Sequence, residues 1–145
     1  MGGFYPPMKH FLFAAALILP SLFAGPVTAE TAADMDAKQA AKEIIQVLKT
    51  QGPQAMQAYV ANCYAQNPVS MHCLYLDAGG NQIYGYIFGV MHQPRDPYFF
   101  GAPYAARIAP VMKQAGIGFD QETQFLKTLQ KVQGPALYAA YVAKN

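Results

Sequence analysis

Apolar residues recur at steps of three and four between residues 34 and 50, which is the spacing of one face of an α-helix. Asp34 stands at the start of this segment and Lys49 near its end, as the helix dipole favours. Gly52 follows and is typical of a helix end. We therefore predict a helix over Asp34–Thr50. Its apolar face consists of Ala37, Ala40, Ala41, Ile44, Ile45, Val47 and Leu48.

A second helical stripe follows at once. Pro53 suits the first position of a helix, where its missing N–H costs no hydrogen bond, and Asn67-Pro68 is typical of a helix end. We predict a second helix between them. Its apolar stripe consists of Met56, Tyr59, Val60, Cys63 and Tyr64.

The densest run of β-forming residues lies near the middle of the chain. Two such runs, Cys73–Asp77 and Gln82–Met91, flank the sequence Ala78-Gly-Gly-Asn81, and glycine and asparagine tolerate the positive φ of a tight turn. The pattern predicts a β-hairpin. A short helix is the alternative for Gly85–Gly89, because this segment is also a G-x-x-x-G. Its glycines leave room for a ligand or for close packing, and packing is the commoner reason.

The last third of the chain has the pattern of helices. Pro103–Gly116 predicts one with a break before Pro110, because an internal proline removes a helical hydrogen bond. Asp120 is a suitable N-cap for a helix over Gln121–Val132, and Gly134-Pro135 predicts the start of a last helix.

These elements together predict an α+β fold, a mostly helical single domain with four or five helices packed on a central β-hairpin. The segment Lys49–Ala61 also matches Lys131–Ala143 at eight of thirteen positions. Either this match arose by chance in an alanine-rich chain, or one unit of helix, Gln-Gly-Pro break and helix occurs twice. In the second case the two helix pairs flank the hairpin with pseudosymmetry.

The N-terminus has the pattern of a secretory signal peptide. Lys9 precedes an apolar run over 11–24, and small residues lead to Ala29, after which we predict cleavage. A membrane anchor is the alternative, but the run is shorter than the roughly 20 residues that span a bilayer. Met8 suits the start of a signal peptide better than Met1 does. We therefore expect residues 1–29 to be removed and residues 30–145 to form one periplasmic or secreted domain, not embedded in a membrane.

The two cysteines of the chain, Cys63 and Cys73, are most simply a disulfide in an exported protein. A bond between them closes a loop that contributes about 3 kcal/mol to stability by the loop-entropy relation. A redox-active pair is the alternative, but it lacks the C-x-x-C spacing that lowers a thiol pKa.

Composition excludes several functional classes. The net charge is +2 and no Lys/Arg cluster occurs, so we expect no nucleic-acid partner. The chain has no G-x-S-x-G, P-loop, G-x-G-x-x-G or H-E-x-x-H motif, so we assign no catalytic residue and expect no cofactor. His72 and His92 with Asp77 or Asp96 are metal-ligand candidates, but their spacing fits no known metal motif and we expect ordinary structural histidines.

An aromatic, proline-rich segment over 92–103 is the strongest candidate for a binding loop. Two arginines bracket it, and a planar guanidinium receives a carboxylate through two hydrogen bonds. In the alternative, Arg95 pairs with Asp96 or a backbone carbonyl and the aromatic rings cap the core, which is the commoner outcome. The predicted ligand-binding residues are Arg95, Tyr98, Phe100, Tyr104 and Arg107.

The segment Leu74–Asn81 reads Leu-Tyr-Leu-Asp-Ala-Gly-Gly-Asn, follows a two-part helix, and precedes an aromatic segment and the stretch Arg107–Phe119. Over residues 34–119 this order resembles the single Cache type of extracytoplasmic sensor domain. That family has a long helix, a strand ending in D-x-x-G, and then a loop and helix that close on a G-x-G-aromatic-like turn. The resemblance implies a small-ligand pocket near the hairpin and the aromatic loop.

Two functional hypotheses follow. In the first, the protein is an exported non-enzymatic module that binds a small anionic or aromatic ligand. In the second, it is a protein-interaction factor of the cell envelope, such as an inhibitor, an immunity-type protein or an accessory protein. The second predicts an exposed apolar patch around the aromatic loop. A hydrolase is a third class, for which the sequence supplies no catalytic set.

Overall fold

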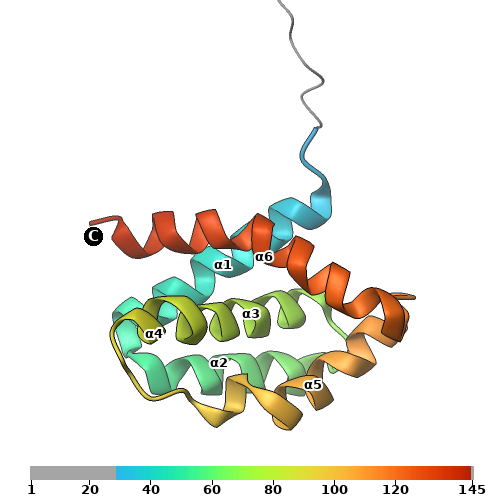
Figure 1. Cartoon of the computed structure of the whole chain (residues 1–145), viewed down its shortest axis with the longest axis horizontal. Coiled ribbons are helices and arrows are strands. Elements are labelled where there is room, and N and C mark those ends of the chain that lie inside the picture. The colour runs from blue at the N-terminus through green and yellow to red at the C-terminus, as the bar shows by residue number, and fades with distance from the viewer. Residues whose placement is uncertain (1–28, 145) are drawn as a thin grey trace, which may run out of the picture.

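The computed structural model of the chain describes residues 29–144, and all regular structure within them is helical (Figure 1). The predicted signal peptide therefore lies almost wholly outside the described residues. The prediction of an α+β fold is wrong, because residues 29–144 contain no strand. The elements are α1 (Ala32–Gln51), α2 (Pro53–Gln66), α3 (Met71–Gln82), the π-helix η1 (Ile83–Ile87), α4 (Phe88–Val90), the 3₁₀-helix η2 (Pro97–Phe99), α5 (Gly101–Gln114) and α6 (Phe119–Val142).

The first two helices lie where the sequence predicts them. Thr31 begins α1 with a capping box, in which the Thr31 Oγ1 accepts the Asp34 N–H and the Asp34 carboxylate accepts the Thr31 N–H. Gly52 ends α1 with a φ of +88°, which favours glycine, and Pro53 begins α2. The predicted apolar face of α1 is buried from Ala37 to Val47.

Helix α3 replaces the first predicted strand and the predicted turn. Every side chain from Cys73 to Gly80 is buried, so this helix is covered on all sides. It contains the short apolar run Leu74-Tyr75-Leu76, and such a run cannot be told from a buried strand by periodicity. Gly80 does not form a turn: a Cβ there would overlap the Phe99 ring, so the glycine permits close packing.

The second predicted strand, Gln82–Met91, is also helical as far as Val90. The chain continues from α3 through the π-helix η1 into α4, so the alternative of a short helix over Gly85–Gly89 is the one that the structure adopts. The π-helical turn is wider than an α-helical turn and is often found at functional sites. It ends beside α6, where Tyr86 and Ile87 face the groove described below.

The two predicted breaks in the C-terminal helices are absent. Pro110 lies inside α5, and Pro135 lies inside a single helix α6, which Figure 1 shows bending along its length. Each proline removes the hydrogen bond to the carbonyl four residues earlier, at Ala106 and Lys131. Both of those residues are exposed, so water can bond the freed carbonyls and the helices continue.

The internal match is therefore not a structural repeat. Gly52 ends a helix in a left-handed conformation, whereas Gly134, its counterpart, lies within α6. The same Gln-Gly-Pro sequence thus forms a break in one place and a continuous helix in the other.

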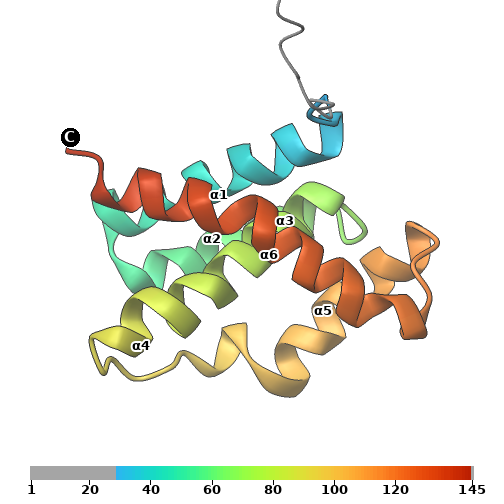
Figure 2. The ribbon, with the colours of Figure 1, turned by 45° about the horizontal axis from the view of Figure 1, so that its top comes forward.

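Helix α3 lies at the centre of the molecule and contacts α1, α2, α5 and α6. Figure 1 shows it between α2 and the crossing pair of α1 and α6, and Figure 2 shows α6 crossing in front of it. Phe99, the last residue of η2, is fully buried beside it, and the Asn81 Nδ2 donates to the Phe99 carbonyl at 2.7 Å. Within residues 29–144, no helix has both the length and the apolar character that crossing a membrane requires.

Candidate functional site

Arg107, one of the predicted ligand-binding residues, is engaged within the protein. Its Nε and Nη2 each lie 2.9 Å from a carboxylate oxygen of Asp77. Nη2 also donates to the Tyr98 carbonyl at 2.6 Å, and Nη1 donates to the Pro103 carbonyl at 3.0 Å. A guanidinium has five N–H donors. Four are thus used, and no pair of parallel donors is left for the carboxylate of a ligand.

The partner of Arg107 lies in the core. Asp77 is fully buried on α3; burial raises the pKa of its carboxyl, and the guanidinium opposes this shift. The Arg107 guanidinium lies over the Tyr98 ring, with its Cζ 3.5 Å from the ring centroid. Burial and the charge of Asp77 raise the pKa of Tyr64 and of Tyr104. These contacts tie α5 to α3.

The other predicted residues do not gather around one cavity. Arg95 is exposed and lies over the Phe100 ring, 5.0 Å from its centroid, while Asp96 caps η2 by accepting the Tyr98 N–H. Of the five residues, Tyr104 alone lines one of the two hollows described next.

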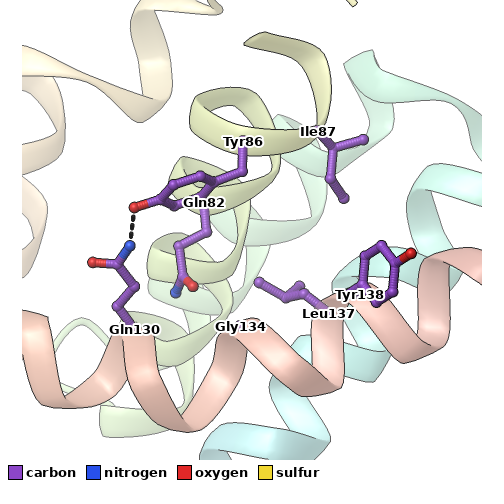
Figure 3. Close-up of a pocket in the computed structure, with 7 residues that line it drawn as sticks. All are labelled: Gln82, Tyr86, Ile87, Gln130, Gly134, Leu137 and Tyr138. Carbon is purple, nitrogen blue, oxygen red and sulfur yellow. Dashed lines mark hydrogen bonds between the residues drawn. The ribbon is translucent and has the colours of Figure 1, made fainter. Parts of the chain in front are cut away.

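A hollow of about 250 Å³ opens between η1 and α6 (Figure 3). All of its lining side chains are uncharged and most of them are apolar or aromatic, which is typical of a small-molecule site. The lining residues are Gln82, Tyr86, Ile87, Gln130, Gly134, Leu137 and Tyr138.

A second hollow of about 240 Å³ adjoins the first and shares Gln82, Tyr86 and Gln130 with it. The Gln130 Nε2 donates a hydrogen bond to the Tyr86 hydroxyl, and Figure 3 shows this bond between η1 and α6. We call the two hollows together the α6 groove. The Tyr86 and Gln130 pair divides it into a more apolar half beside Leu137 and a more polar half beside Lys127.

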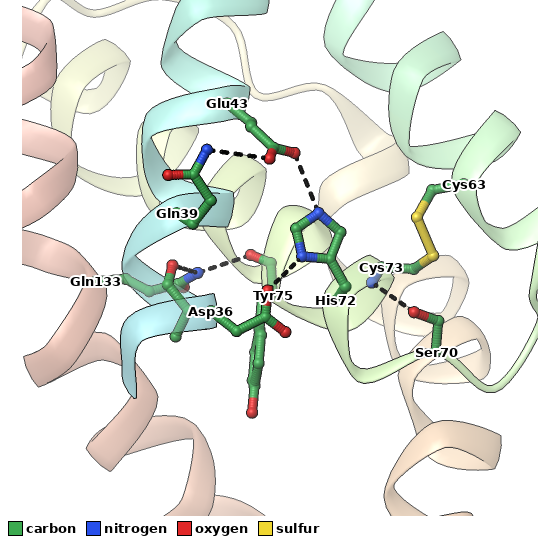
Figure 4. Close-up of polar contacts among 10 residues, drawn as sticks. Asp36, Gln39, Glu43, Cys63, Ser70, His72, Cys73, Tyr75 and Gln133 are labelled. Atoms are coloured by element: carbon green, nitrogen blue, oxygen red, sulfur yellow. Dashed lines mark hydrogen bonds and ion pairs between the residues drawn. A yellow bond between two sulfur atoms is a disulfide. The ribbon is translucent and has the colours of Figure 1, made fainter. Parts of the chain in front are cut away.

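A buried pair of amides fixes the chemistry at the floor of this groove. The Gln133 Nε2 donates to the Ala37 carbonyl at 3.1 Å and to the Tyr75 carbonyl at 2.8 Å; Figure 4 shows the bond to Tyr75. Because a backbone carbonyl only accepts, the Gln133 amide has one orientation. Its Oε1 therefore faces Gln82 and accepts the Gln82 Nε2–H at 2.8 Å.

The direction of this network leaves one acceptor free. Gln82 is 7% exposed, and its Oε1 has no hydrogen-bond partner. Figure 3 shows the Gln82 side chain reaching toward α6 near Gly134. A buried acceptor without a partner costs about 1–3 kcal/mol, so a ligand that donates a hydrogen bond there recovers free energy.

Gly134 lies beside this acceptor. A Cβ at this position would stand 4.0 Å from the Gln82 Oε1. The glycine lies inside α6 with no positive φ, so the backbone conformation does not require it. Glycine in a helix interior costs about 1 kcal/mol relative to alanine. What it provides here is room beside Gln82.

His72, near the start of α3, is held by polar contacts to α1 (Figure 4). His72 Nδ1 lies 2.7 Å from Asp36 Oδ1, and His72 Nε2 lies 3.1 Å from Glu43 Oε2, so the imidazole bridges two positions of α1. Burial lowers the pKa of His72, but the hydrogen bonds to both carboxylates outweigh it and raise the pKa. Beside this cluster, the sulfurs of Cys63 and Cys73 are at disulfide distance, 2.02 Å.

The predicted metal candidates do not come together. His72 binds Asp36 and Glu43, Asp77 binds Arg107, and Asp96 caps η2. No group of three His, Cys, Asp or Glu side chains that could hold a metal ion occurs in residues 29–144.

Apart from Tyr104, the residues of the α6 groove are not among those predicted from the sequence, which place the site in the aromatic loop. One signal was present: Gln133 stands between Leu129 and Leu137 at four-residue steps, on the apolar face of its helix. An amide in that position predicts a buried hydrogen-bonded group.

No protein family model, curated protein or solved structure matches this chain. The resemblance to single Cache domains remains a prediction that these comparisons do not address. The residues that carry it, Leu74–Asn81, lie on α3 rather than on a strand.

Proposed function

We propose that the protein is an exported, non-enzymatic module that binds a small ligand in the α6 groove. The observation that carries this proposal is the Gln82 Oε1, a buried acceptor whose orientation the backbone fixes and which has no partner. Export is supported by the N-terminal pattern of the sequence and by the cysteine pair at disulfide distance. The seven residues around the apolar half of the groove include neither a carboxylate nor an imidazole for acid and base chemistry.

Substitution of Gly134 by alanine tests the binding site without damaging the fold. The added methyl enters the groove beside Gln82, while alanine in a helix interior stabilises by up to about 1 kcal/mol. We expect fragment screening by NMR to find ligands that shift the resonances of Leu137 and Tyr138 in the wild type. Gly134→Ala should lose these shifts and keep or raise the melting temperature.

Gly89→Ala is the matched control, because it adds the same methyl in α4 with only ordinary contacts and does not line the groove. It should bind the same fragments as the wild type. A screen in which no fragment shifts Leu137 or Tyr138, or equal binding by Gly134→Ala, would contradict the proposal.

The export part has its own experiment. The full chain, produced with its own N-terminus in a host with an oxidising export compartment, should be recovered without residues 1–29. Its mass should rise by about 2 Da on reduction, from the two protons that one disulfide gains. Recovery of the uncleaved chain with free thiols would refute the assignment of compartment.

A second candidate function is protein interaction. Large apolar side chains are exposed on η1, α4 and the end of α6, which lie on one side of the molecule in Figure 1. They are Tyr86, Val90, Met91, Tyr138 and Val142. A photo-crosslinking residue at Val90 should then capture one partner at one mass in the exporting cell, and the same residue at exposed Gln57 on α2 should not.

A further inference from the structure

The apolar half of the α6 groove has a shape and polarity that define a chemical class of ligand. Its volume of about 250 Å³ exceeds the roughly 150 Å³ of an apolar cavity that binds benzene. The Tyr86 and Tyr138 side chains at its edge are 58% and 67% exposed, so their rings are available for contact with a ligand. Aromatic rings pack favourably against such side chains. The space thus suits a single aromatic ring or two fused rings.

The charge of the ligand is restricted as well. The seven lining residues carry no cation that would neutralise a carboxylate or phosphate, and the free Gln82 Oε1 would repel either group. Removing an anion from water without a partner is costly. A neutral N–H or O–H donor, in contrast, gives the buried acceptor the partner that it lacks.

Resting on the proposed function, we infer that the ligand is an uncharged aromatic compound of one or two rings that donates one hydrogen bond to the Gln82 Oε1. The rings lie between Tyr86, Leu137 and Tyr138, and the donor points to the floor of the groove beside Gly134. This chemistry differs from the anionic alternative that the two arginines of the aromatic loop predict.

Three probes of nearly equal size test the inference on the wild-type protein. Indole has the ring system and one N–H, 1-methylindole lacks the donor, and indole-3-carboxylate adds a negative charge. In NMR titrations that follow Leu137 and Tyr138, we expect saturable binding of indole and about tenfold weaker binding of 1-methylindole, since one hydrogen bond contributes about that factor. Indole-3-carboxylate should bind more weakly than indole.

Two variants test the atom that is proposed. Gln82→Met removes the acceptor and should abolish the difference between indole and 1-methylindole. Because this variant also removes the donor to Gln133, Gly134→Ala serves as the second variant and should bind indole at least tenfold more weakly while remaining folded.

Equal binding of indole and 1-methylindole to the wild type would overturn the donor requirement, as expected if Gln82 holds only a water molecule. Tighter binding of indole-3-carboxylate would overturn the neutral class. If neither indole nor 1-methylindole binds while other fragments shift the Leu137 resonances, the inference fails and the proposed function stands. If no fragment binds at all, both fail.

Discussion

Gln82 and Gln133 are 51 positions apart in the chain and form a hydrogen bond of 2.8 Å in the core, from the Gln82 Nε2 to the Gln133 Oε1. This bond joins α3 to α6, and Gln133 extends it to the α1 backbone at Ala37. One buried amide therefore links three helices that the chain order keeps apart. The same bond determines which atom of Gln82 faces the α6 groove.

Loss of the Gln133 amide should destabilise the protein strongly. Gln133→Met leaves the buried Gln82 Nε2 without an acceptor, which costs about 1–3 kcal/mol. The double variant Gln82→Met/Gln133→Met removes both partners, so its loss should be smaller than the sum of the two single losses. Urea unfolding measures all three values, with exposed Gln124→Met as the control. Additive losses would show that the two amides do not act together.

Glycine in α3 serves packing, and this has a direct test. Gly80→Ala forces a methyl into the fully buried Phe99 ring, so we expect a loss of about 1–3 kcal/mol, the usual cost of overpacking. Gly85→Ala is the matched control, because nothing lies within 4 Å of the added methyl. It should be neutral or slightly stabilising in thermal unfolding. Similar melting temperatures for the two variants would argue against the close contact of α3 with Phe99.

The two arginines near the aromatic loop should differ sharply in their effect on stability. Arg107→Met leaves the fully buried Asp77 carboxylate without its partner, which costs about 3–5 kcal/mol. Arg95 is exposed, and Arg95→Met should cost less than about 1 kcal/mol. Chemical denaturation of both variants measures the difference. A small loss for Arg107→Met would make its guanidinium available for a ligand, as the sequence predicts.

The stability should depend on pH through His72. Its pKa in the folded state is raised above the ordinary value of 6.5, so the charged imidazole stabilises the fold fully below that value. The contribution is lost as the pH rises through the raised pKa. It should stay below about 1 kcal/mol, because the His72 side chain is 32% exposed. The difference in unfolding free energy between wild type and His72→Gln should therefore shrink from pH 6 to pH 9, and a difference that grows would contradict this assignment.

The sequence was informative for helices that have one exposed face and one buried face. The apolar stripe of α1 and the Gly52-Pro53 junction depend on neighbours in the chain, and α1 and α2 lie where they were predicted. The prediction is wrong for α3, where the run Leu74-Tyr75-Leu76 has the composition of a strand. In the structure all sides of that helix are covered, so the polar positions that reveal helical periodicity are missing.

The candidate site could not be predicted from neighbouring residues either, and the cause is related. The arginines that bracket the aromatic loop are the candidates in the sequence, because a planar guanidinium can receive a carboxylate through two hydrogen bonds. In the structure the charge of Arg107 is neutralised by Asp77, which stands 30 positions earlier, and the unpartnered polar atom beside the α6 groove, the Gln82 Oε1, belongs to a neutral amide. Whether a buried polar atom has a hydrogen-bond partner depends on how distant elements pack. The spacing of residues in the chain does not predict it.

The amino-acid sequence by itself was enough to predict a signal peptide at the N-terminus, a bond between the two cysteines, and the helices α1 and α2, whose apolar stripes and ends depend on local residues. The tertiary structure alone decided that residues 73–91 are helical, that Gly134 continues a helix where Gly52 ends one, and that the Gln82 Oε1 is free. The physical reason is the range of the interactions. Caps and stripes act within a few residues, whereas burial on all sides and the pairing of buried polar groups depend on elements that meet only after folding.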